Sequence, residues 1–172
     1  IDWRPKFLWY KPHIAVLSGI AWDHINVFPT IENYVELFEF FTKTIEEGGL
    51  LSYYHGEEEL RKNTDNLEGI ELKQYTTHTH LIEKGVTSIG TSEGWKTLKI
   101  FGEHNLQNMM AAFHVCKAVG ISDEAFYNAI QSFSGAAKRL ELIAQTDRIT
   151  IYKDFAHSPS KLKATTKAVK KQ

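Results

Sequence analysis

Cysteine is almost absent from the 172-residue sequence, which contains only Cys116. A single cysteine cannot form an internal disulfide, so a disulfide-stapled secreted domain is excluded and a reducing compartment, the cytoplasm, is predicted. No apolar run reaches the roughly 18 residues of a membrane helix, and the first residues lack the charge order and the apolar core of a signal peptide. The sequence therefore predicts a cytoplasmic protein with no membrane partner.

An excess of charge of one sign is also lacking, because 20 Lys and Arg stand against 21 Asp and Glu, for a formal net charge of -1. A balanced chain has no global field that would gather a polyanion, and the aromatic residues lie mostly in apolar patterns rather than between basic residues. Nucleic acid is therefore not a predicted partner. With 42% hydrophobic and 24% charged residues, disordered and collagen-like chains are excluded as well.

An initiator methionine is missing, since the sequence begins at Ile1, and a lysine-rich helical stretch simply stops at Gln172. We therefore expect a processed, excised or truncated polypeptide. A chain of this length can bury one substantial core or two small ones, so length alone does not decide the number of domains.

What the sequence does contain is an alternation of strand and helix patterns. Residues 13–20 are a continuous apolar run, which is typical of a buried strand in a parallel sheet. Thr30 fits the N-cap of a helix that ends before Gly48, and Ser122 fits the N-cap of another. Further strands are predicted over residues 50–54, 140–145 and 149–152, short strands or hairpin arms between residues 70 and 100, and helices over residues 57–66, 104–119 and 122–133 and from residue 160. The alternation predicts the α/β class, and the last strand, loop and helix predict the start of a second α/β domain.

Two pairs of polar residues stand where such a fold places functional groups. Asp23 and His24 follow the first buried strand, where a neutral imidazole can ligate a divalent metal and a carboxylate can fix its geometry; a capping Asp beside a partly exposed His is the alternative. Asn105 and Asn108 share one face at the start of a predicted helix, where amides can read a flat heterocycle. A plain N-cap is the alternative for Asn105.

A third constellation has the composition of a nucleotide site. Arg139 suits phosphate by its bidentate geometry, and Asp154, with His157 three residues later, suits ribose hydroxyls, although each residue alone is ordinary surface charge. A decoy lies at residues 90–97, which resemble a phosphate loop. A true one has four residues between its glycines and a lysine directly after the second, so a hairpin turn is predicted there instead.

Taken together, four motifs in order resemble the Mur ligase family, the ATP-dependent amide-forming enzymes of peptidoglycan assembly. They lie at residues 19–29, 102–112, 135–141 and 154–159. The resemblance implies that residues 1–136 are the C-terminal part of a central ATPase domain with a mostly parallel sheet, and that residues 137–172 begin a Rossmann-like C-terminal domain. It also implies a role in cell-wall biogenesis, and with it in cell shape and cell division.

The resemblance carries roles over residue by residue. His24 would be a ligand of Mg2+, and Asn105 and Asn108 would contact the adenine end of ATP. Arg139 would approach the phosphates, Asp154 would meet the ribose, and His157 would line the cleft near the reacting groups as a catalytic residue. The family's carbamylated lysine has no match here, and a carboxylate role for Glu39 is left open.

The implied reaction is attack by a substrate carboxylate on the gamma-phosphorus of ATP, which gives ADP and an acyl phosphate that an amine captures. Residues 2–12 resemble the murein peptide ligase branch, which joins UDP-N-acetylmuramate to the recycled tripeptide L-alanyl-gamma-D-glutamyl-meso-diaminopimelate. The branch that adds L-alanine is the alternative, and a noncatalytic nucleotide-binding module of the same fold is another. Because the family's phosphate loop and its UDP-binding domain are not in this sequence, the chain alone is expected to be inactive.

Overall fold

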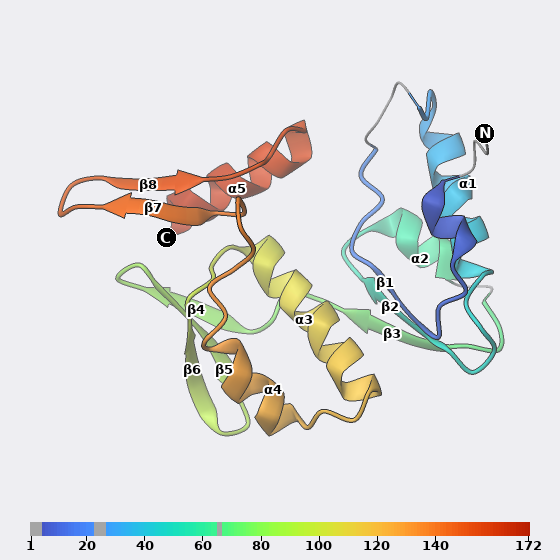
Figure 1. The fold of residues 1–172 in the computed structure, drawn as a ribbon, viewed down its shortest axis with the longest axis horizontal. Coiled ribbons are helices and arrows are strands. Elements are labelled where there is room, and N and C mark those ends of the chain that lie inside the picture. Colours follow the sequence, from blue (N-terminus) through green and yellow to red (C-terminus); the bar gives the residue numbers. More distant parts are fainter. Residues whose placement is uncertain (1–4, 23–26, 65–66) are drawn as a thin grey trace. The chain divides into compact units, whose positions relative to one another are not determined.

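The computed structural model describes residues 5–22, 27–64 and 67–172, and the chain divides into two compact units (Figure 1). Unit 1 comprises Ile1–Thr76 and Gln107–Ile121, and unit 2 comprises Thr77–Leu106 and Ser122–Gln172. Helix α3 (Glu103–Ala118) begins within unit 2 and continues in unit 1. The domain boundary predicted between residues 136 and 137 stays a prediction.

Unit 1 is built on a three-stranded parallel sheet in the order β1 (Ile14–Leu17), β2 (Leu50–Tyr54) and β3 (Glu71–Tyr75). Parallel neighbours need crossover connections, and these contain α1 (Ile31–Thr42) and α2 (Glu58–Thr64), while a 3-10 helix, η1 (Lys6–Trp9), precedes the sheet. The parallel strand that the sequence predicts is confirmed at Ile14–Leu17, but its burial is not, because Ala15 and Leu17 are buried while Val16 is exposed.

The apolar core of unit 1 lies between the sheet and helices α1 and α2. Leu51 in the central strand and Leu60 in α2 are both fully buried, and Phe38 of α1 packs against the cluster to which they belong. Helix α1 starts where the sequence predicts, because the Thr30 hydroxyl accepts a hydrogen bond from the Asn33 N–H at 3.2 Å. These contacts fix the sheet on which the rest of unit 1 is arranged.

The opposite face of β2 meets α3 through polar pairs, because successive side chains of a strand point to opposite faces. The hydroxyl of Ser52, which is fully buried, lies 2.9 Å from Nδ1 of His114. Gln107 Nε2 donates to the Tyr54 hydroxyl at 3.0 Å. Burial lowers the pKa of His114, and the positive charges of Lys73 and Lys117 lower it further.

We expect unit 1 to lose stability when the pH falls from 7.5 to 5. Because the folded-state pKa of His114 lies below its unfolded value, the unfolded chain binds more protons under acid, and the stabilisation present above pH 6.5 is lost as the pH falls through the folded pKa. Thermal unfolding at both pH values measures this. His114→Asn should reduce the difference between the two midpoints; an unchanged difference would show that His114 is not its source.

Unit 2 contains an antiparallel meander of β4 (His80–Glu83), β5 (Val86–Thr91) and β6 (Gly94–Leu98), accompanied by α4 (Asp123–Ile130). The β5–β6 turn confirms the hairpin predicted at residues 90–97, since Thr91 pairs with Gly94. Helix α4 begins as predicted, with the Ser122 hydroxyl accepting from the Ala125 N–H at 3.2 Å.

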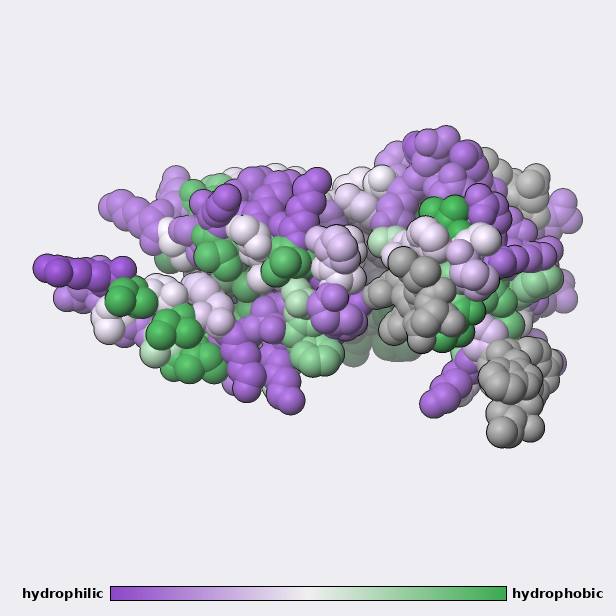
Figure 2. All heavy atoms as spheres, turned by 90° about the horizontal axis from the view of Figure 1, so that it is seen from above, coloured by the Kyte–Doolittle hydropathy of each residue, from purple (hydrophilic) through white to green (hydrophobic). Residues whose placement is uncertain are grey.

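The rest of unit 2 is an antiparallel hairpin of β7 (Glu141–Gln145) and β8 (Thr150–Lys153), followed by α5 (Pro159–Lys171). A small core of Phe101, Leu140 and Ala168 joins the hairpin base, α5 and the segment before α3. Farther along the hairpin, apolar side chains are exposed, and Figure 2 shows them among polar ones at its left end. In the described part of the chain, no helix has the length and apolar character needed to span a membrane.

Candidate functional site

Arg139 lies at an exposed turn just before β7. Its neighbours Lys138 and Leu140 both have left-handed backbones, with φ of 60° and 47°. The Arg139 N–H donates to the Ala136 carbonyl at 3.1 Å, which closes the turn. Leu140 is buried in the small core of unit 2, so the turn is attached to that core directly beside the exposed arginine.

Asp154 lies in the loop after β8 and holds this turn in place. Its Oδ2 accepts the Leu140 N–H at 2.8 Å, and its Oδ1 accepts the Ala156 N–H at 2.7 Å and the Thr165 hydroxyl at 3.3 Å. An ionised carboxylate has about four acceptor positions. Three are therefore used inside the protein, which leaves about one for a ribose hydroxyl.

His104 is the residue of this site that the sequence prediction missed. Its half-buried imidazole lies against Gly102, and burial lowers its pKa, while the charge of Asp154 raises it and that of Arg139 lowers it. Burial therefore disfavours the charged form of this ring, whose pKa also responds to the charges of the predicted residues Arg139 and Asp154. The sequence pointed to His104 as a site residue only through its position next to Asn105.

Asn105 is not the N-cap of α3, because the helix begins two residues earlier, at Glu103. The Asn105 side-chain amide Nδ2 donates to the Phe101 carbonyl at 2.8 Å. This leaves the side-chain oxygen Oδ1 as the acceptor, which is the group that an exocyclic adenine amine requires. Since Phe101 also packs against Leu140, Asn105 belongs to the same part of unit 2 as Arg139 and Asp154.

The first turn of α3 is joined to α5 by a charge cluster. Glu103 accepts from Lys167 at 2.7 Å and from Lys171 at 2.5 Å. Hydrogen bonds from these two ammonium groups hold the pKa of the Glu103 carboxyl at about 2. The cluster fixes the helix end that carries His104 and Asn105.

The remaining predicted site residues are Asn108, His157 and His24. Asn108 is exposed in α3. His157 is exposed in the loop after β8, with its Nδ1 3.0 Å from the Phe155 carbonyl; if this nitrogen carries the proton, Nε2 is left as an acceptor. His24 lies outside the described residues. The roles predicted for all of these residues stay predictions.

Several glutamates gather beside α1. Glu39 lines an open acidic pocket of about 510 Å³ beside α1. The lining also includes Glu32, Glu36 and Glu59. Across residues 5–22, 27–64 and 67–172, no group of three His, Cys, Asp or Glu side chains is arranged to hold a metal ion. The prediction of Mg2+ therefore still depends on His24, which lies outside the described residues.

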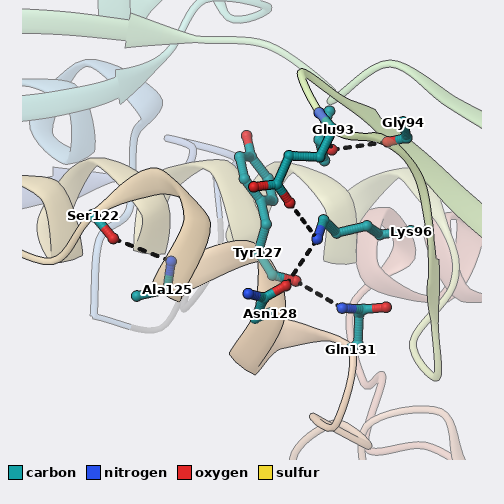
Figure 3. Close-up of polar contacts among 9 residues, drawn as sticks. Glu93, Gly94, Lys96, Ser122, Ala125, Tyr127, Asn128 and Gln131 are labelled. Atoms are coloured by element: carbon teal, nitrogen blue, oxygen red, sulfur yellow. Dashed lines mark hydrogen bonds and ion pairs between the residues drawn. The ribbon is translucent and has the colours of Figure 1, made fainter.

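A second polar cluster in unit 2 has a structural explanation. Figure 3 shows Lys96 of β6 between Glu93 and Asn128, and its Nζ lies 2.7 Å from the Glu93 carboxylate and 2.8 Å from Asn128 Oδ1. His78 Nε2 lies 3.0 Å from the Tyr127 hydroxyl. These pairs attach the meander to α4, which agrees with reading residues 90–97 as a hairpin rather than a phosphate loop.

A family described as the Mur ligase middle domain matches residues 4–116. Among curated relatives, the UDP-N-acetylmuramate–L-alanine ligase of Renibacterium salmoninarum is 32% identical, over 96% of this chain and 38% of its own. The corresponding enzyme of Pelotomaculum thermopropionicum is 31% identical, over 95% of this chain and 38% of its own. The chain spans about two fifths of the length of the curated relatives it matches.

Solved structures share the fold at lower identity. MurF from Acinetobacter baumannii has a TM-score of 0.81 at 19% identity, over 96% of this chain and 39% of its own. The UDP-N-acetylmuramate-alanine ligase MurC from Thermotoga maritima has a TM-score of 0.69 at 17% identity, over 95% and 39%. The tripeptide ligase MPL from Neisseria meningitides has a TM-score of 0.63 at 20% identity, over 76% and 43%. The α/β fold class predicted from the sequence is confirmed.

Proposed function

Since the chain belongs to the Mur ligase family, we propose that it is part of an ATP-dependent ligase that joins L-alanine to UDP-N-acetylmuramate in peptidoglycan synthesis. The observation that carries this proposal is the similarity, at 31% and 32% identity over nearly the whole chain, to curated L-alanine ligases. This similarity favours the L-alanine-adding branch, which the sequence analysis gave as the alternative, over the tripeptide-recycling branch. The tripeptide reading remains a second candidate, which the resemblance of residues 2–12 supports.

The proposed reaction uses ATP to activate the carboxylate of UDP-N-acetylmuramate. The carboxylate attacks the gamma-phosphorus, ADP leaves, and the amine of L-alanine displaces phosphate from the acyl phosphate. Mg2+, for which His24 is the predicted ligand, would offset charge on the phosphoryl groups. The described residues of this chain would bind and orient the nucleotide, a positioning and electrostatic task.

Each described nucleotide residue has a geometry that suits its proposed role. Arg139 is an exposed guanidinium on a fixed turn, which suits phosphate oxygens. Asp154 keeps about one acceptor position for a ribose hydroxyl beside its three internal bonds. Asn105 keeps its amide oxygen for the adenine amine. His157 would lie near the reacting groups, and Asn108 would add a second adenine contact.

Asn105→Ala in the full-length protein should raise the KM for ATP by about 2-fold to 10-fold, because one net hydrogen bond is worth roughly 0.5–1.5 kcal/mol. Steady-state kinetics with ATP as the varied substrate measure this. Asn128→Ala is the matched control, because it removes an amide side chain that bonds Lys96 in the other polar cluster; its KM should not change. A KM for ATP that is the same in all three proteins would remove Asn105 from the nucleotide site.

A further inference from the structure

The turn that carries Arg139 has a strained backbone. Of the three non-glycine residues with positive φ in the described part of the chain, two are Lys138 and Leu140, which flank Arg139 directly. Left-handed backbone is unfavourable for residues with a Cβ, and such conformations persist only where surrounding contacts impose them. Hydrogen bonds to the backbone of residues 138–140 impose this one.

Four hydrogen bonds fix the turn. The Lys138 N–H donates to Oε2 of Glu141 at 2.8 Å, and the Lys138 carbonyl accepts the Phe155 N–H at 2.9 Å. The Arg139 N–H donates to the Ala136 carbonyl, and the Leu140 N–H donates to Asp154 at 2.8 Å. Two of the four acceptors are carboxylates, which accept more strongly than neutral oxygens.

We propose that Glu141 and Asp154 are positioning residues that lock the strained turn so that Arg139 is held ready for the phosphate chain of a nucleotide. This inference rests on the proposed function. A guanidinium on a preordered backbone loses less conformational freedom when it binds an anion, so locking the turn tightens nucleotide binding without a new contact. Glu141 tests the idea best, because Asp154 is also a proposed ribose contact.

Because Glu141 is charged, its electrostatic effect and its positioning effect change nucleotide affinity in opposite directions. Removal of a carboxylate near a phosphate site strengthens anion binding if charge alone matters. Loss of the lock has the opposite effect, since the Lys138 N–H then has no side-chain acceptor. Glu141→Gln removes the charge but keeps an oxygen for this N–H, whereas Glu141→Ala removes both.

The experiment measures the dissociation constant of the non-hydrolysed ATP analogue AMPPCP, with Mg2+, for the full-length protein. Arg139→Ala should weaken binding by about 10-fold or more, the size expected for a charge-assisted hydrogen bond. Glu141→Ala should weaken it by about 3-fold to 10-fold, and Glu141→Gln by less than about 2-fold. Asp147→Ala, which removes an exposed carboxylate in the β7–β8 turn, is the control and should bind as the unmodified protein does.

The double variant Arg139→Ala with Glu141→Ala separates positioning from general structural damage. If Glu141 acts through Arg139, the double variant should bind as Arg139→Ala alone does. Equal weakening by Glu141→Ala in both backgrounds, or tighter binding by Glu141→Ala, would overturn the inference while leaving the proposed function intact. Unchanged binding by Arg139→Ala would overturn the phosphate role of Arg139 in the proposed function, and the inference with it.

Discussion

Gly102→Ala is expected to destabilise the protein by about 2–4 kcal/mol and to disturb the start of α3. Gly102 has φ +88°, which costs a residue with a Cβ about 1 kcal/mol or more. A Cβ at this position would lie 2.7 Å from the Ala168 Cβ and 3.1 Å from the His104 ring, and such overpacking costs about 1–3 kcal/mol more. Because the Gly102 carbonyl accepts from the Asn105 N–H, the shift should also raise the KM for ATP.

Gly120→Ala is the matched control at the other end of the same helix. Gly120 has nearly the same backbone angle, φ +90°, but among the described residues no atom beyond its chain neighbours lies within 4 Å of the position of its Cβ. Gly120→Ala should therefore lower the free energy of unfolding only by the cost of a Cβ on a left-handed backbone, about 1 kcal/mol. Chemical denaturation of both variants measures the difference. Equal losses of stability would mean that the packing of Gly102 against Ala168 and His104 is not tight.

Leu51→Ala should cost about 2–5 kcal/mol, the range for truncating a fully buried leucine. Leu51 is fully buried in the central strand of unit 1 and belongs to the core that includes Leu60. The truncation removes apolar contacts between the sheet and the helices and leaves a cavity. The unfolding free energy from denaturant titration measures this.

Leu72→Ala provides the comparison within the same sheet. Leu72 is the register partner of Leu51 in β3, but 36% of it is exposed. Less of its apolar surface leaves water on folding, so its truncation should cost about 1 kcal/mol or less. If the two variants lost the same stability, the core on this face of the sheet would be packed as tightly at β3 as at the central strand.

Local patterns predicted most elements of the fold. Thr30 and Ser122 were recognised as N-caps because a hydroxyl in front of an apolar-periodic segment can accept the orphan N–H groups of a helix start. The β5–β6 hairpin was predicted because its glycines stand at turn spacing. These signals depend on residues only a few positions apart.

The turn that carries Arg139, and the carboxylates that hold it, could not be predicted from such local patterns. Asp154 bonds the backbone of Leu140 from 14 residues away, and side-chain acceptors of this kind leave no periodic pattern. Lys138 and Leu140 have left-handed backbone conformations, although neither is Gly or Asn, the residue types from which such a conformation is predicted. The predicted helix start at residue 104 is one residue from the observed start at Glu103, but the alternative of an N-cap at Asn105 is wrong. The turn before the helix lies at Gly102, whose backbone closely approaches Ala168.

The measurement that tests the central claim most directly is ATP-dependent phosphate release by the full-length protein supplied with UDP-N-acetylmuramate and one amino substrate at a time. The account predicts release with L-alanine and little with L-alanyl-gamma-D-glutamyl-meso-diaminopimelate. Release with the tripeptide alone would contradict the proposed substrate and return the protein to the recycling branch. No release with either substrate, from folded protein that still binds UDP-N-acetylmuramate, would contradict the proposed ligase reaction itself.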